Sequence, residues 1–155
     1  MRARTVTAHL DAAPEAVFRM LIDPARLPVW NSAVRRVLDA PSSLSDGAEW
    51  VVEMHALGQS WPSRARVLEL DPAGRVFRYR ACTDDGNPSY TVWSWRVTPA
   101  QGGGSEVSVS WELNPKTFWR RVLLGRIRQR QLQRGEVPAS LCALGATAQS
   151  ASPVS

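Results

Sequence analysis

Cysteine and histidine are scarce in this sequence, and their scarcity excludes two common kinds of site. The 155 residues include two cysteines, Cys82 and Cys142, which are too few and too far apart for a disulfide framework. The two histidines, His9 and His55, add no short Cys/His spacing of the kind that holds zinc, so we expect no metal ion. Free thiols are typical of the reducing cytoplasm, which is the compartment that we expect.

Long apolar runs are also missing. No stretch approaches the ~20 consecutive apolar residues of a membrane-spanning helix, and the first residues lack the apolar centre of a signal peptide. With 44% hydrophobic and 21% charged residues, the composition is that of an ordinary folded protein. At this length we expect one domain over residues 1–148, followed by a flexible tail at 149–155.

Lysine is nearly absent: the sequence contains one lysine, Lys116, and 18 arginines. The net charge of +5 is concentrated in residues 116–155, which hold seven basic residues and one acidic residue, Glu136. This basic segment has two interpretations: a solvated helix face, or a surface at 116–134 that docks a nucleic acid or a protein. No nucleic-acid-binding motif accompanies the charge, so we expect the solvated face and no nucleic acid partner.

Hydrophobic periodicity divides the chain into a clear order of elements. A strand is predicted at residues 5–10, then a helix that Asp11 or a neighbour caps, then a second short helix from residue 23 to residue 30. From residue 34 onward the period changes to two, and Gly, Asn and Pro mark frequent turns. Short turns favour an antiparallel meander of six further strands, near residues 34–39, 48–56, 61–70, 75–82, 89–98 and 105–113.

The chain returns to helical character from residue 116 to residue 148. Val137 and Leu144 belong to an apolar stripe at helical spacing, which predicts a buried helix face. Gly135 and Pro138 predict a kink or break within this helix, since proline removes a backbone donor. The whole pattern indicates an α+β fold with a long C-terminal helix.

Four short motifs stand out within this order of elements. They are Ala12-Ala13-Pro14-Glu15-Ala16-Val17-Phe18, Asp23-Pro24 with Leu27-Pro28-Val29-Trp30-Asn31, Val67-Leu68-Glu69-Leu70-Asp71-Pro72, and the Gly-rich turn before Ser105-Glu106-Val107. In these motifs the chain resembles the polyketide cyclase/dehydrase-like branch of the SRPBCC superfamily, over residues 4–146. That superfamily shares its fold with START lipid-transfer domains and with the major birch-pollen allergen.

The resemblance implies a helix-grip fold, in which a seven-stranded antiparallel sheet curves around the C-terminal helix and two short helices follow the first strand. It also implies a cavity between the sheet and that helix. Strand alternation independently indicates which apolar faces point inward, and a concave apolar cavity is typical of a ligand site. The residues that we expect to contact a ligand are Trp50, Val52, Met54, Phe77, Tyr79, Trp93, Trp95, Val109, Trp111 and Ile127.

Tyr79 and Arg130 are the two candidates for a catalytic role. The Tyr79 hydroxyl either donates to a ligand carbonyl or reaches the surface or a backbone partner. Arg130 lies on the backward continuation of the apolar stripe, where its guanidinium would pair with a carboxylate, phosphate or enolate. A kink near Pro138 would instead turn Arg130 and Arg134 toward water, because proline breaks the helical phase.

Other noticeable residues indicate simpler roles. Alternation places His55 on the outer face of its strand, which predicts a solvated histidine. Trp30 is expected to anchor the second short helix. The run Gly102–Gly104 precedes a strand, whereas phosphate-binding loops precede a helix, so it predicts a hairpin turn. With no such loop, no Ser-His-Asp set and no paired inward carboxylates, we expect no cofactor.

These features lead to one main functional hypothesis and two alternatives. The main hypothesis is that a hydrophobic small molecule, lipid-, quinone- or polyketide-like, binds in the cavity between the sheet and the C-terminal helix. The first alternative is an enzyme of the polyketide cyclase/dehydratase type. The second is a partner-binding module that uses the basic C-terminal helix. The sequence leaves the ligand open, and it leaves a monomer or a homodimer open.

Overall fold

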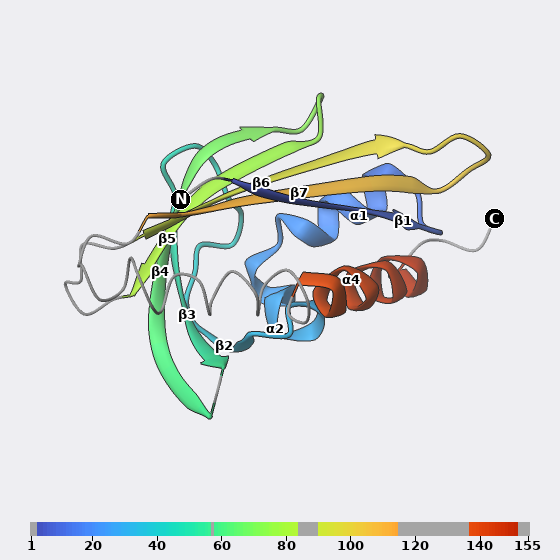
Figure 1. The fold of residues 1–155 in the computed structure, drawn as a ribbon. Helices are drawn as coiled ribbons and strands as arrows, with labels where there is room; N and C mark the ends of the chain where they lie inside the picture. Colours follow the sequence, from blue (N-terminus) through green and yellow to red (C-terminus); the bar gives the residue numbers. More distant parts are fainter. Residues whose placement is uncertain (1–2, 57, 84–89, 115–136, 152–155) are drawn as a thin grey trace.

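The computed structural model describes residues 3–56, 58–83, 90–114 and 137–151 (Figure 1). Within these residues, seven antiparallel strands form one sheet in the order β1-β7-β6-β5-β4-β3-β2. The strands are β1 (Arg4–Leu10), β2 (Val34–Asp39), β3 (Glu49–Ala56), β4 (Gln59–Asp71), β5 (Val76–Thr83), β6 (Tyr90–Pro99) and β7 (Ser105–Asn114). The meander therefore runs from β2 to β7, and β1 adds the last edge. The predicted α+β helix-grip fold is confirmed.

The helices lie together on one side of the curved sheet (Figure 1). They are α1 (Pro14–Leu21), the short 3-10 helix η1 (Pro24–Arg26), α2 (Leu27–Trp30) and α4 (Val137–Ala151). Helix α4 contacts α1, α2 and β1, so it closes the inner face of the sheet, the face that packs against the helices. The expected first part of the C-terminal helix, residues 116–136, lies outside the described residues. Helix α4 continues to Ala151, which places the first part of the expected tail at 149–155 in the helix.

The start of α1 is capped by a neighbour of Asp11, the alternative that the prediction left open. Pro14 stands in the first turn, and Glu15 follows it. The capping position is Ala13, which has no side-chain hydrogen bond to the helix, so Asp11 is not the cap. Asp11 is two residues too early in the chain, and its carboxylate contacts His9 Nε2 at 3.1 Å instead.

Strand β7 shows why the sheet has one apolar face. Val107, Trp111 and their alternating neighbours are buried, whereas Glu106 and Glu112 are exposed. This alternation turns every second side chain toward the helices. The inner face of β7 therefore belongs to the core along its whole length.

Glycine is required at the turn between β6 and β7. Gly102, Gly103 and Gly104 have φ values of 86°, 107° and 77°, which strongly favour glycine. The backbone N–H of Ala100 donates to the Gly104 carbonyl at 3.1 Å. A Cβ at Gly104 would also overlap the carbonyl oxygen of Leu10. The predicted hairpin turn is confirmed.

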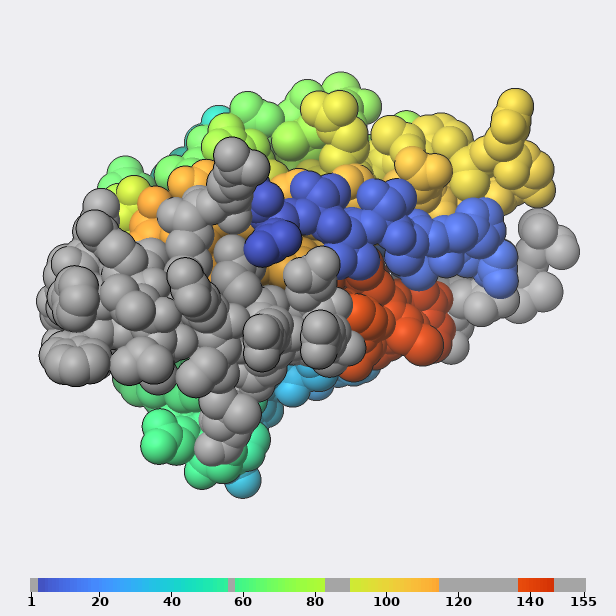
Figure 2. Space-filling view, viewed as in Figure 1, coloured from blue at the N-terminus to red at the C-terminus, as the bar shows by residue number. Residues whose placement is uncertain are grey.

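Helix α4 packs closely against β1. Figure 2 shows the two elements, red and blue, in contact at the surface. A Cβ added at Gly145 would lie 2.9 Å from Leu10 Cδ2, so the glycine permits this close approach. Leu141 and Leu144 of the predicted apolar stripe are buried beside it.

The opposite edge of the sheet, β2, is irregular. Its pairing with β3 shifts register twice, between Val34 and Arg36 and between Val37 and Asp39. Arg36 pairs with Glu53 of β3 at 2.5 Å. Bulges of this kind bend and twist an edge strand.

Candidate ligand-binding cavity

A cavity of about 60 Å³ lies between the inner face of β3–β6 and helix α2 with the start of α4. Its floor is made of small side chains, Ser63 and Ala65 on β4 and Ala81 on β5. In the sheet register, Ala65 lies between Trp50 of β3 and Ala81. The small side chains leave room that their large neighbours do not fill, and this room is the cavity.

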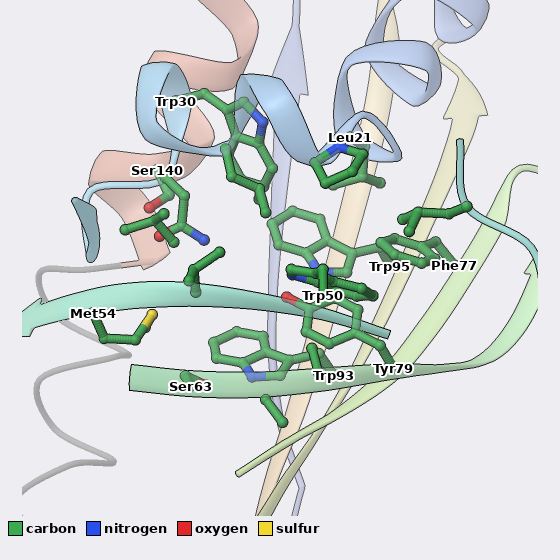
Figure 3. A pocket seen from close by; sticks show the side chains of 18 of the residues that line it. Leu21, Trp30, Trp50, Met54, Ser63, Phe77, Tyr79, Trp93, Trp95 and Ser140 are labelled. Atoms are coloured by element: carbon green, nitrogen blue, oxygen red, sulfur yellow. The ribbon is translucent and has the colours of Figure 1, made fainter. Parts of the chain in front are cut away.

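Stacked aromatic rings form one wall of the cavity (Figure 3). The Trp50 and Tyr79 ring centroids are 5.1 Å apart, and Tyr79 stacks on Trp93 at 6.4 Å with 20° between the planes. Phe77 adds a further ring, 6.0 Å from Trp50. The register explains the row, because Tyr79 of β5 is directly opposite Trp93 of β6. A wall of flat apolar rings suits a planar or extended apolar ligand.

The helical side of the cavity is built around Trp30 of α2. Its ring meets Trp95 of β6 edge to face, with centroids 5.6 Å apart and 84° between the planes. Both side chains are almost completely buried, at 2% and 3% exposure. The other apolar lining residues outside strands β3–β6 are Leu21, Pro24, Leu27, Val34, Leu44 and Val137.

The polar groups around the cavity are few, and two of them also hold the fold together. Asn31 Oδ1 accepts a hydrogen bond from the Ala33 backbone at 3.1 Å. Ser140 Oγ of α4 accepts one from the Ser32 backbone at 3.0 Å, which ties α4 to the segment after α2. Among the described lining residues there is no Asp, Glu, His, Lys or Arg, and Tyr79 alone carries a titratable group. This set of side chains is suited to binding an apolar molecule.

The family model for polyketide cyclase / dehydrase and lipid transport proteins matches residues 1–136. The chain belongs to this family. This confirms the resemblance that the sequence motifs indicate. No curated protein matches the sequence.

Several solved structures have the same fold as this family member. The Zhui aromatase/cyclase from Streptomyces sp. R1128 has a TM-score of 0.77 at 16% identity, over 95% of this chain and 93% of that chain. Ara h 8.0201 has a TM-score of 0.69 at 15% identity, over 96% and 98%. A protein from Chromobacterium violaceum has a TM-score of 0.71 at 24% identity, over 95% and 96%. At these identities the likeness concerns the fold alone.

Most residues expected to contact a ligand are brought together around the cavity of this family member. They are Trp50, Val52, Met54, Phe77, Tyr79, Trp93 and Trp95. Val109 and Trp111 lie on the same inner face, but they are 0% and 1% exposed and pack into the closed core rather than around the cavity. The remaining candidates, Ile127 and Arg130, lie outside the described residues, as does Arg134.

Sequence reasoning missed the cavity floor and most of the helical side. Ser63, Ala65 and Ala81 alternate with exposed or half-buried neighbours, so their inward direction is readable, but small residues give no apolar signal. Trp30 does sit in the short helix as expected, and it also lines the cavity. Its role at the cavity depends on the place where α2 folds back onto the sheet, and local periodicity in the sequence does not predict that place.

His55 has the exposed position that strand alternation predicts. Its Nδ1 lies 2.9 Å from Ser60 Oγ. In the described part of the chain, no three Cys, His, Asp or Glu side chains gather where they could hold a metal ion. A search of the same residues finds no helix with the length and apolar character needed to cross a bilayer.

Proposed function

We propose that this protein binds a hydrophobic small molecule, lipid-, quinone- or polyketide-like, in the cavity between β3–β6 and the helices. The observation that carries the proposal is the cavity itself, walled by Trp50, Tyr79, Trp93 and Phe77 above a floor of small side chains. The family name supports it, because lipid transport is one of the roles that it describes.

Binding requires the cavity to widen. Its volume of about 60 Å³ suffices for a few water molecules, at roughly 10–15 Å³ each. Typical ligand sites are larger, at roughly 300–1,000 Å³. Met54, Tyr79 and Trp93 are large lining side chains that are only half-buried, so they have more room to change rotamer than the fully buried ones. A ligand would enter by displacing them.

An enzyme of the cyclase or dehydratase type is the second candidate. Figure 3 shows the Tyr79 hydroxyl toward the middle of the cavity, where it would polarise a carbonyl of the ligand. The Zhui protein is named as an aromatase/cyclase, which favours the same chemistry. Binding stands first because the described lining residues hold no acid–base pair. If the ligand is recovered unchanged after incubation with the protein, the result supports binding. If the recovered compound has lost one molecule of water, the result supports the enzyme.

Binding is tested with a substitution that fills the space above the cavity floor. Ala65 is 4% exposed and lines the cavity, so Ala65→Leu places three extra carbon atoms in the space that a ligand would occupy. The added atoms and a bound probe would compete for the same space, and overpacking of this kind costs about 1–3 kcal/mol. We therefore expect the affinity for 8-anilinonaphthalene-1-sulfonate to fall about tenfold or more. The affinity is measured by fluorescence titration of the purified chain.

The matched control is Ala73→Leu, the same change in the exposed turn between β4 and β5. This variant should bind the probe like the original chain. Circular dichroism melts verify that both variants fold. Equal probe affinity in Ala65→Leu, Ala73→Leu and the original chain would contradict binding in this cavity.

A further inference from the structure

Two buried hydrogen-bond donors at the cavity have no acceptor. The indole Nε1 atoms of Trp30 and Trp95 are shielded from water, and neither has a hydrogen-bond partner in the described part of the chain. Both rings line the cavity, and Figure 3 shows the Trp30 ring reaching from the helical side toward Trp95 of the sheet. The two side chains, called the indole pair below, come from α2 and β6, so the fold itself brings them together.

Unpartnered buried donors are rare in folded proteins, and each calls for an explanation. Among the residues that the structure describes, the other buried side-chain nitrogen and oxygen atoms have partners. The Ser105 hydroxyl donates to the Ala12 carbonyl at 2.5 Å, and Ser140 Oγ accepts from the Ser32 backbone at 3.0 Å. The indole pair is therefore an exception to how the rest of the described core handles its polar atoms.

The contact between the two rings explains one unpartnered donor at most. In an edge-to-face pair, one ring points its edge at the face of the other, and an N–H on that edge makes a weak bond to the aromatic face. The second ring presents its face, so its own N–H points elsewhere. At least one of the two buried donors therefore remains without an acceptor, on a ring that lines the cavity.

We propose that the indole pair is the polar anchor of the ligand site and receives an oxygen acceptor of the ligand, a ketone or quinone carbonyl or a phenolic oxygen. This inference rests on the proposed function and narrows it. Among the described lining residues no charged side chain competes for the oxygen, and indoles only donate, so the site favours an acceptor over an amine. The ligand is then an oxygenated aromatic compound rather than a plain hydrocarbon chain.

The test compares two probes that differ in one group, 1-indanone and indane. Both are rigid bicyclic compounds, and the ketone replaces one methylene. In a spectrum of the full chain with ¹⁵N-labelled tryptophan, 1-indanone should move the Trp30 and Trp95 indole N–H resonances downfield, whereas indane should not. This experiment uses the unmodified protein, so it does not depend on a variant that folds.

Trp30→Phe and Trp95→Phe supply the quantitative arm and assign the resonances. Each removes one N–H and keeps an aromatic ring, and we expect each to lower the ratio of 1-indanone affinity to indane affinity about fivefold. Trp93→Phe is the matched control, because it removes an indole from the same cavity that is not among the unpartnered donors. It should change both affinities alike and leave the ratio unchanged.

The possible outcomes separate this inference from the proposed function. Binding of both probes with no downfield shift, or with a ratio that Trp30→Phe and Trp95→Phe leave unaltered, overturns the anchor and leaves the apolar site standing. No binding of either probe overturns the apolar site and the anchor with it. A shift confined to 1-indanone and a ratio lowered in these two variants support the anchor.

Discussion

The inner face of the sheet has two ends that are packed differently. At the closed end, under α1 and α4, Val17, Val97, Val107 and Leu144 are all 0% exposed. At the cavity end, Met54, Tyr79 and Trp93 are only half-buried around a hollow. One continuous sheet carries both ends, so the difference does not come from the backbone.

The difference comes from the sizes of the side chains. The closed end contains many valine and leucine side chains, which are similar in volume and interdigitate well, together with the fully buried Trp111. The cavity end places tryptophan, tyrosine and phenylalanine beside alanine and serine, and such a mixture leaves a gap. The closed end is therefore densely packed, whereas the cavity end is not, and we expect the closed end to contribute more to stability.

The largest expected effect is a loss of stability, and it is compared between one leucine at each end. Leu144→Ala removes a side chain that is completely buried, and we expect a loss of about 3–4 kcal/mol in the free energy of unfolding. Leu21 of α1 is also buried, at 3% exposure, but it borders the cavity, so we expect Leu21→Ala to cost only about 2 kcal/mol. Urea denaturation of both variants measures the two values.

Leu21→Ala has a second expected result, since it enlarges the cavity. The affinity for 8-anilinonaphthalene-1-sulfonate should rise in Leu21→Ala and remain unchanged in folded Leu144→Ala. Equal losses of stability in both variants would show that the two ends are packed alike.

A smaller difference in stability is expected between substitutions of two tryptophans that are directly opposite each other in neighbouring strands. Trp111 is 1% exposed, whereas Trp93 is half-buried and lines the cavity. We expect Trp111→Phe to cost about 2 kcal/mol of stability and Trp93→Phe less than about 1 kcal/mol. Probe affinity should change only in Trp93→Phe. The reverse order of stability losses would place the main core at the cavity end.

The smallest effect tests an ion pair at the closed end. Arg75, in the turn between β4 and β5, donates to the Glu15 carboxylate of α1 at 3.1 Å and to the Val97 carbonyl at 3.2 Å. Glu15 is 66% exposed, so we expect Glu15→Gln to lower stability by only about 0.5 kcal/mol. Added salt should erase this difference in thermal melts, because exposed pairs are screened. A loss above 2 kcal/mol would contradict a surface role for the pair.

The strands and their inward faces were largely predictable from the sequence. Strand β7 alternates valine or tryptophan with charged or small polar residues, and only one face of such a strand can join the core. Turn residues then delimit the strands, as Gly102–Gly104 does. These signals are local, so a single sequence contains them.

The position of the cavity was predictable only in part. Alternation gives Trp93 and Trp111 the same inward direction, and it does not say which one borders a hollow. That depends on the small side chains of β4 and on Trp30, which reaches the sheet only after the chain folds back. Whether the indole donors find acceptors is likewise a tertiary property.

The irregular edge strand β2 has a consequence for the protein at high concentration. A regular edge presents a row of unpaired backbone groups that another chain can extend, which is how many sheets aggregate. In β2 the pairing shifts twice, and Arg35 and Arg36 are exposed there. A second copy would meet mismatched donors and acceptors together with positive charge, so this edge is a poor template for further strands. The irregular pairing and the two arginines thereby disfavour the joining of copies of the chain into a fibre at this edge.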